Sequence, residues 1–298
     1  MKITAITPYL LRAPTGAQAF YSSQALFPER NSCLVRVETD QGLTGWGEGG
    51  QWGPGAPVAS VIRDVLGPRL IGRDPTEPVR LWEEAYAATR DFGQKGTYIE
   101  AISALDIALW DIAGQAVGWP VWKMLGGRFR ERITAYATGC YYPTDFRDKA
   151  SMMAKLRAEV EGYAGAGFGL IKVKIGLLPL AEDLARLAMI REVLGPEMII
   201  MVDANHAYAP GTAVQMARLM APLDIRFFEE PVVPEDRDGY AKVRAEGGIP
   251  VAGGECEFTR FGFRDLIGGG CVDIAQPDLA AAGGFTAYRE ILTLAQCH

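Results

Sequence analysis

The sequence lacks the long apolar run that a membrane span requires. Such a span takes roughly 18 apolar residues without charges, and no stretch of this chain reaches that length. The first residues, MKITAITPYLLRAP, also lack a signal-peptide cleavage pattern. We therefore expect a cytoplasmic protein that has no membrane partner.

Cysteine is scarce, and positive charge is not in excess. The five cysteines are widely scattered and form no CxxC pair, so we expect reduced, mostly buried thiols rather than a disulfide framework or a zinc knuckle. The formal net charge is −6, which argues against a nucleic-acid partner because phosphate is bound by a basic surface. No GxGxxG or P-loop motif opens a helix, so a nucleotide-binding sheet has no support.

The first part of the chain has the pattern of an α+β domain, which we assign to residues 1–128. Apolar and polar residues alternate with the period of a strand, and a turn at residues 40–42 predicts a hairpin. A helical pattern follows and ends at Gly118, with its longest helix at Tyr98–Val117. The predicted strands are residues 2–11, 33–39 and 43–48.

The second part, residues 129–298, repeats a strand followed by a helix. This repeat predicts a parallel sheet with right-handed crossovers. A (β/α)₈ barrel and an open doubly wound sheet both fit, and we favour the barrel because no nucleotide-binding motif is present. The six predicted strands are Thr134–Thr138, Leu170–Ile175, Met198–Asp203, Ile225–Glu229, Val251–Gly254 and Val272–Ala275.

Three acidic residues, Asp203, Glu229 and Glu255, come at the carboxyl ends of successive predicted strands. They are 26 residues apart in both intervals, which predicts the same place for each in its own unit. Parallel barrels assemble their sites at this edge. One such acid alone is better explained as a solvated helix cap, but three in register favour a bound cation. Oxygen ligands without histidine or thiolate indicate Mg²⁺. Strand alternation sends the neighbouring Glu230 to the other face.

Two lysines, Lys172 and Lys174, lie on the strand before the first acid. Period-two alternation places both on one face and turns Val173 toward the helices. The alternative is a pair of exposed lysines at an edge. Burial disfavours a charged ammonium, so we expect a lowered lysine pKa and a base that works near neutral pH.

These residues resemble a known family. The KVK motif, the acid triad, DIAQPD, and ALDIALWDIAGQAVGWPVWKMLGG in the first domain are similar to the mandelate racemase branch of the enolase superfamily. The resemblance implies an N-terminal capping domain over a modified TIM barrel. It implies that Asp203, Glu229 and Glu255 bind Mg²⁺, that Lys174 removes the proton α to a carboxylate, and that Lys172 assists it.

The resemblance also implies a second acid/base, a histidine on the seventh barrel strand that is oriented by an aspartate. Asp278 matches this aspartate, whereas His298 directly follows a predicted helix and does not match the histidine. We therefore expect that the chain is truncated, with the last barrel units missing. The full-length protein is expected to be a homo-oligomer.

Within the branch, the segments AYATGC, DANHAY, FFEEPVVPE, IPVAGGE and QPDLAAAGGF most resemble D-galactarolactone cycloisomerases. This implies a small-molecule sugar acid or its lactone as substrate, opened to a 3-deoxy-2-keto acid. Asn205, His206 and Tyr208 are predicted substrate contacts, and residues 14–29 and 49–57 are predicted lids. The alternatives are a sugar-acid dehydratase or racemase, or a non-catalytic remnant that binds metal.

Overall fold

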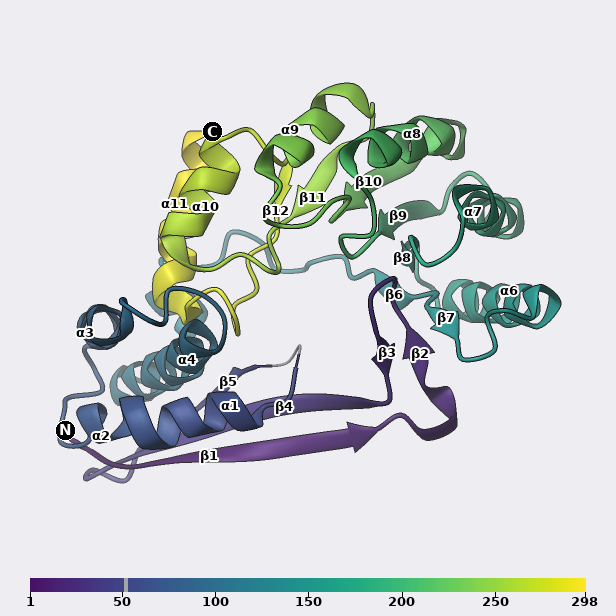
Figure 1. Cartoon of the computed structure of the whole chain (residues 1–298). Helices are drawn as coiled ribbons and strands as arrows, with labels where there is room; N and C mark the ends of the chain where they lie inside the picture. The colour runs from purple at the N-terminus through teal and green to yellow at the C-terminus, as the bar shows by residue number, and fades with distance from the viewer. Residues whose placement is uncertain (51–52) are drawn as a thin grey trace.

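The computed structural model describes residues 1–50 and 53–298. Figure 1 shows an antiparallel region at the bottom of the view and, above it, an arc of parallel strands with helices outside. The prediction of a partial (β/α) barrel with an N-terminal α+β domain is confirmed. Among the residues that the structure describes, none of the helices combines the length and apolarity needed to cross a membrane.

The N-terminal region, called the cap below, is a three-stranded antiparallel sheet with the order β1-β4-β5. The predicted hairpin is confirmed, because β4 and β5 pair through register partners such as Val35 and Gly47. The predicted long helix is α4, which begins one residue earlier than expected and ends before Gly118 in the left-handed conformation. The bounds are β1 (Ile3–Pro14), β4 (Glu29–Thr39), β5 (Thr44–Gly49), α1 (Ala56–Ser60), η2 (Val61–Leu66), α2 (Gly67–Leu70), α3 (Pro78–Thr89), α4 (Thr97–Val117) and α5 (Val121–Met124).

Glycine lets α4 lie directly on β5. Gly45, Gly47 and Gly49 alternate along the strand and therefore share one face. A Cβ added at Gly47 would overlap the carbonyl oxygen of Ala104. In the same way, a Cβ at Gly45 would overlap the carbonyl oxygen of Ala108, and one at Gly49 that of Glu100. The backbone of α4 thus replaces the side chains that this face of the strand lacks.

The C-terminal region is a six-stranded sheet with the order β12-β11-β10-β9-β8-β6. Neighbouring strands of this sheet pair in parallel, as predicted from the repeat. The first strand is shorter than predicted and lies later in the chain. The bounds are β6 (Ala137–Gly139), β8 (Leu170–Lys174), β9 (Ile199–Asp203), β10 (Ile225–Glu229), β11 (Val251–Gly253) and β12 (Ile274–Ala275).

Helices cover the outside of this sheet (Figure 1). The first of them, α6, follows the first strand of the sheet, and its residues Met152, Leu156 and Val160 are buried at four-residue intervals. The bounds are α6 (Lys149–Gly165), α7 (Leu180–Leu194), α8 (Pro210–Met220), η3 (Ala221–Leu223), α9 (Arg237–Glu246), α10 (Thr259–Gly268) and α11 (Gly284–Cys297).

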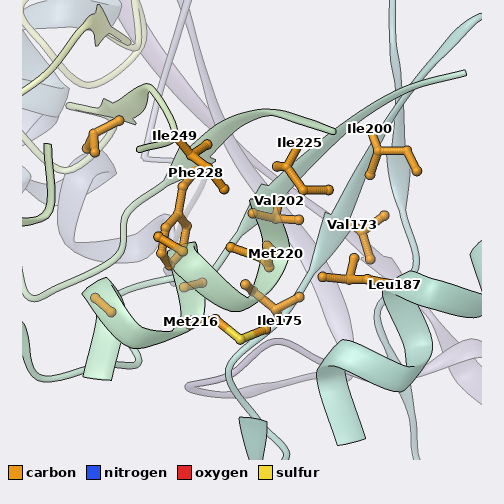
Figure 2. Packing of buried hydrophobic residues seen from close by; sticks show 14 of the residues in the cluster. Val173, Ile175, Leu187, Ile200, Val202, Met216, Met220, Ile225, Phe228 and Ile249 are labelled. Atoms are coloured by element: carbon orange, nitrogen blue, oxygen red, sulfur yellow. The ribbon is translucent and has the colours of Figure 1, made fainter. Parts of the chain in front are cut away.

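Alternation along the strands separates a core from the interior of the arc. Val173, Ile200 and Val202 point toward the helices and pack with Leu187 and Met220 (Figure 2). Each of these apolar side chains contributes roughly 1.5–3 kcal/mol by leaving water. The prediction that Val173 faces the helices is confirmed. The opposite positions of the same strands therefore face the interior of the arc.

A small antiparallel sheet joins the cap to the barrel region. It has the order β3-β2-β7, formed by β3 (Leu26–Phe27), β2 (Phe20–Tyr21) and β7 (Tyr142–Pro143). The sequence predicts a lid at residues 14–29 but not its two short strands, because strands of two residues are too short to show a period. The second predicted lid, residues 49–57, includes residues 51 and 52, which lie outside the described residues.

The last helix, α11, packs on the cap rather than only on its own sheet. Its residue Ala287 belongs to the cap's apolar core. At the start of α11, the backbone N–H of Gly283 donates to Ser103 Oγ over 2.8 Å, and Trp82 Nε1 donates to the Gly283 carbonyl over 2.8 Å. These contacts fix the cap relative to the sixth strand–helix unit.

Candidate metal centre and active site

Strand register brings a lysine and two of the predicted metal ligands into one row. Lys174 on β8 pairs with Asp203 on β9, which pairs with Glu229 on β10. The next partner, on β11, is Ala252 rather than Glu255. The prediction that all three acids occupy the same place is therefore right for Asp203 and Glu229 and wrong for Glu255.

The local backbone explains the position of Glu255. Strand β11 ends at Gly253, and Gly254 then turns the chain with φ +125°, a conformation that only glycine adopts readily. Glu255 follows this turn. Burial raises the pKa of the Glu255 carboxyl, and the negative charges of Asp203 and Glu229 raise it further. The equal spacing in sequence thus leads to a shared neighbourhood but not to a shared register.

The two lysines face the interior, as predicted, and both are paired with the carboxylates. Lys172 Nζ lies 2.7 Å from Glu229 Oε1 and 3.5 Å from Asp203 Oδ2. Lys174 Nζ donates to Asp203 Oδ2 and, over 3.0 Å, to Asn205 Oδ1. The lysines are only 7% and 6% exposed, and Asp203 and Glu229 are fully buried. The four side chains form a buried chain of ion pairs in the order Glu229, Lys172, Asp203 and Lys174.

The predicted lowering of the lysine pKa is wrong for this structure. Burial does lower the pKa of both ammonium groups, but the neighbouring charges outweigh it. Glu229 and Asp203 raise the pKa of Lys172, and Asp203 and Tyr141 raise the pKa of Lys174. Burial alone would lower the pKa of a lysine, but neighbouring carboxylates stabilise its charged ammonium form and raise the pKa.

The pKa values of the three acids shift in different directions. Burial raises the pKa of Asp203, but Lys174 and Lys172 together lower it below its usual value. Burial and then Asp203 raise the pKa of Glu229, and burial, Asp203 and Glu229 raise the pKa of Glu255 to about 7. Two buried carboxyl groups and a half-buried third that repel one another at one edge of a sheet suit a hard divalent cation. The donor set therefore fits Mg²⁺.

Three further side chains lie beside these ion pairs. The Tyr141 ring centre lies 5.3 Å from Lys174 Nζ, and the Tyr136 ring centre lies 5.8 Å from Lys172 Nζ. Gln276 Nε2 donates to Glu229 Oε2 over 3.0 Å. The sequence analysis did not assign these residues to the site. The signal for Tyr141 and Gln276 is their place just after the first and sixth strands, where a barrel assembles its site.

The three predicted substrate contacts lie in different surroundings. Asn205 is beside Lys174. His206 contacts other groups: its Nδ1 lies 3.3 Å from the carbonyl oxygen of Val232, and its Nε2 lies 3.2 Å from Glu230 Oε2. Tyr208 is buried in the core between sheet and helices, with its ring 6.2 Å from that of Phe228. The structure brings only the first of the three to the lysines.

Asp278 follows the sixth strand and accepts a hydrogen bond from the backbone N–H of Ala280 over 2.8 Å. It faces the cap, because its charge adds to burial in raising the pKa of Glu100 on α4. Asp278 therefore lies at the contact between the barrel edge and the cap.

A buried ion pair holds the end of β8 in place. The guanidinium of Arg186, 1% exposed, donates to the carbonyl oxygens of Lys174 over 2.9 Å and Cys140 over 2.7 Å. It also donates to Asp183 Oδ1 over 2.8 Å, and Tyr142 donates to the same oxygen over 2.7 Å. The backbone of Lys174 is thus fixed from behind.

The first predicted lid, residues 14–29, lies against the barrel edge. Ser23 Oγ is 2.6 Å from the Ala204 carbonyl oxygen and 3.1 Å from that of Asn205. Gln24 Nε2 donates to the same Asn205 carbonyl over 2.6 Å. The predicted lid therefore contacts the loop that follows strand β9.

Comparisons with known proteins match both regions. The family model "Mandelate racemase / muconate lactonizing enzyme, N-terminal domain" matches residues 15–126, and "Enolase C-terminal domain-like" matches residues 155–298. The chain is 44% identical to D-galactarolactone cycloisomerase of Agrobacterium fabrum, over 100% of this chain and 76% of the relative. It is 39% identical to arabinonate dehydratase of Saccharolobus solfataricus, over 88% of this chain and 69% of the relative.

A solved structure gives the same result for the fold. A racemase from Streptomyces coelicolor A3(2), crystallised with bound magnesium, superposes with a TM-score of 0.91 and 32% identity, covering 99% of this chain and 81% of that one. The resemblance inferred from KVK and the acid triad is thus confirmed in both regions of the chain. The chain belongs to the mandelate racemase/muconate lactonizing enzyme family of the enolase superfamily.

Proposed function

We propose that the chain removes the proton α to the carboxylate of a sugar-acid lactone, with Lys174 as the base and Mg²⁺ as the cofactor. The observation that carries the proposal is the buried row Lys174, Asp203 and Glu229, in which a cationic acid/base group lies directly beside a carboxylate pair. A base must lie within hydrogen-bond reach of its proton. The row supports the proposal because the base would lie at the edge of the sheet where the substrate's carboxylate would bind.

Asp203, Glu229 and Glu255 are the residues that would hold the ion. When bound, Mg²⁺ supplies positive charge to the substrate carboxylate, which offsets the charge that builds up as the α-proton leaves. Lys172 lies beside Glu229 and supports the same charge from the protein. Asn205, which accepts a hydrogen bond from Lys174, holds the Nζ atom in place and is our first candidate for a substrate contact. The roles of His206, Tyr208 and Asp278 stay predictions.

We propose a galactarolactone as the substrate, by ring opening to a 3-deoxy-2-keto acid. Lys174, as the neutral amine, takes the α-proton, the Cα–H electrons form a double bond to the β carbon, and the ring oxygen leaves with the bonding pair while remaining tethered. The resulting enol becomes the 3-deoxy-2-keto acid when its O–H proton is lost and the β carbon takes up a proton. The 44% identity to D-galactarolactone cycloisomerase supports this choice. A dehydratase is the second candidate, supported by the 39% identity to arabinonate dehydratase; it would expel water instead.

The test follows a galactarolactone by NMR in D₂O with Mg²⁺. We expect ring opening without loss of water, and a rate at least about 100-fold lower in Lys174→Ala because the base is removed. Lys242→Ala, on the surface of α9 and paired with Glu246, is the matched control and should keep the rate. An unchanged rate of α-proton exchange in Lys174→Ala would refute the base assignment.

The same experiment separates the alternatives. Loss of water would identify a dehydratase, and inversion at the α carbon would identify a racemase. Binding of Mg²⁺ without exchange of any α-proton in the parent protein would identify the non-catalytic alternative, and it would overturn the proposed activity.

A further inference from the structure

Three residues with nitrogen, oxygen and sulfur donors meet just outside the predicted Mg²⁺ ligands. His206 follows β9, Glu230 follows β10 and Cys256 follows β11, so three successive loops each contribute one residue. One ligand atom from each lies within 4.8 Å of the other two. The backbone N–H of His206 donates to the Glu230 carbonyl over 2.8 Å, which joins the first two loops.

The hydrogen bonding of His206 determines which nitrogen carries the proton. Nδ1 lies 3.3 Å from the carbonyl oxygen of Val232, which has no proton to give, so Nδ1–H is the donor. The lone pair of Nε2 then points toward Glu230 and Cys256. Histidines that bind metals nearly always donate their other ring N–H to a carbonyl or carboxylate in this way. The imidazole is therefore oriented as a ligand.

The distances also match a metal site. Nε2 lies 3.2 Å from Glu230 Oε2 and 3.6 Å from Cys256 Sγ. For metal bonds of about 2.0–2.3 Å in a tetrahedron, ligand atoms are roughly 3.3–3.6 Å apart. An ion thus fits between these atoms with little movement of the side chains.

The donor types indicate which ion would bind. Imidazole and thiolate are ligands for borderline or soft divalent ions, whereas Mg²⁺ prefers oxygen. Glu230 is 1% exposed, and Asp203, Glu229 and Glu255 lie close enough to repel its charge. A divalent cation would neutralise a carboxylate that is otherwise surrounded by its own sign of charge.

We propose that His206, Glu230 and Cys256 form a second metal site that takes Zn²⁺ and is separate from the carboxylates of the predicted Mg²⁺ centre. The protons held by the Cys256 thiol and by the buried Glu230 carboxyl leave to solvent as the metal–sulfur and metal–oxygen bonds form. The fourth position of the tetrahedron is left for water. The inference does not depend on the proposed activity, since it concerns a binding equilibrium.

The experiment titrates the full chain with Co²⁺ in the presence of saturating Mg²⁺, and follows absorption. Thiolate ligation to Co²⁺ gives a near-ultraviolet charge-transfer band, which oxygen ligands alone do not give. We expect one equivalent of Co²⁺ to produce this band, and an equivalent of Zn²⁺ to abolish it by displacement. Failure to see a thiolate band would overturn the proposal.

Variants then assign the ligands. Cys256→Ser is expected to remove the band, while Cys297→Ser, which changes an exposed thiol near the chain end, keeps it. His206→Asn and Glu230→Gln retain the thiol and are expected to weaken Co²⁺ binding at least about tenfold. Melting curves without metal check that each variant is folded. A band that survives Cys256→Ser, or an affinity unchanged in both other variants, would refute the three-residue site.

Discussion

The carboxylate of Asp106, on helix α4 of the cap, accepts two hydrogen bonds from Thr286 at the start of α11. The Thr286 backbone N–H donates to Oδ2 over 2.9 Å, and its hydroxyl donates to Oδ1 over 2.6 Å. Trp110 Nε1 completes the group by donating to the same hydroxyl oxygen over 3.0 Å. Asp106 is only 2% exposed, so this acid joins the two regions in a dry contact.

This contact predicts a pH-dependent stability. Burial raises the pKa of Asp106 from 3.8 to about 7, because the Thr286 hydrogen bonds offset burial only in part. Between these two values the folded chain holds a proton that the unfolded chain has lost. The corresponding stabilisation is complete below the lower value and disappears as the pH rises through the upper one. The free energy of unfolding should fall by at most about 1.4 kcal/mol per pH unit in this window.

Urea unfolding at pH 5, 6, 7 and 8, without divalent ions, measures this effect. Because Glu230 and Glu255 have raised pKa values too, the informative quantity is the difference between the parent and Asp106→Asn. The variant lacks the titrating group and should show a flatter slope. Identical slopes in the two proteins would contradict the assignment.

The contact between β5 and α4 predicts a large cost for one methyl group. Gly47→Ala would place a Cβ against the Ala104 carbonyl oxygen and should destabilise the chain by about 3 kcal/mol. Gly162→Ala, within α6 and with no heavy atom near the added Cβ, should stabilise it by about 0.5–1 kcal/mol. Thermal unfolding of both variants measures the contrast. Equal effects would show that α4 moves to accept the methyl group.

The ion pair behind β8 predicts a further difference between buried and exposed pairs. Arg186→Met leaves Asp183 buried without its partner and should lower stability by about 3–5 kcal/mol. Arg218→Met removes an exposed pair with Glu246, whose ions are 3.8 Å apart, and should cost at most about 1 kcal/mol. Chemical denaturation measures both. Comparable losses would mean that the buried pair is no stronger than a surface pair.

The displaced position of Glu255 raises the question of whether it binds the ion. If it does, Glu255→Gln should weaken Mg²⁺ binding at least about tenfold, since a neutral amide replaces one of three anionic ligands. Calorimetric titration measures the affinity, and Glu235→Gln on the exposed surface serves as the control. Unchanged affinity in Glu255→Gln would remove it from the ligand set.

Much of the site could be predicted because strand alternation and strand ends are visible in sequence. Lys172, Lys174, Asp203 and Glu229 follow a period of two and a stop, and the structure places all four as that pattern implies. The position of Glu255 could not be predicted from its spacing, because it depends on the left-handed turn at Gly254.

Other features depend on contacts that no local pattern records. The group of His206, Glu230 and Cys256 forms across three loops, and its geometry depends on left-handed backbone at His206 (φ 65°) and Glu230 (φ 44°). The lysine pKa values follow from neighbours on other strands. The strands β2, β3 and β7 of the small antiparallel sheet have two residues each, which is too few to show a period.

The contact between α4 and α11 has a consequence for the order of folding during synthesis. Helix α4 is complete at Val117, yet the backbone N–H groups that donate to its residues Ser103 and Asp106 come from Gly283 and Thr286, 180 positions later. Until those residues leave the ribosome, the cap carries an unsatisfied, partly apolar face. The contact that joins the cap to the last strand–helix unit can therefore form only after that unit has been synthesised.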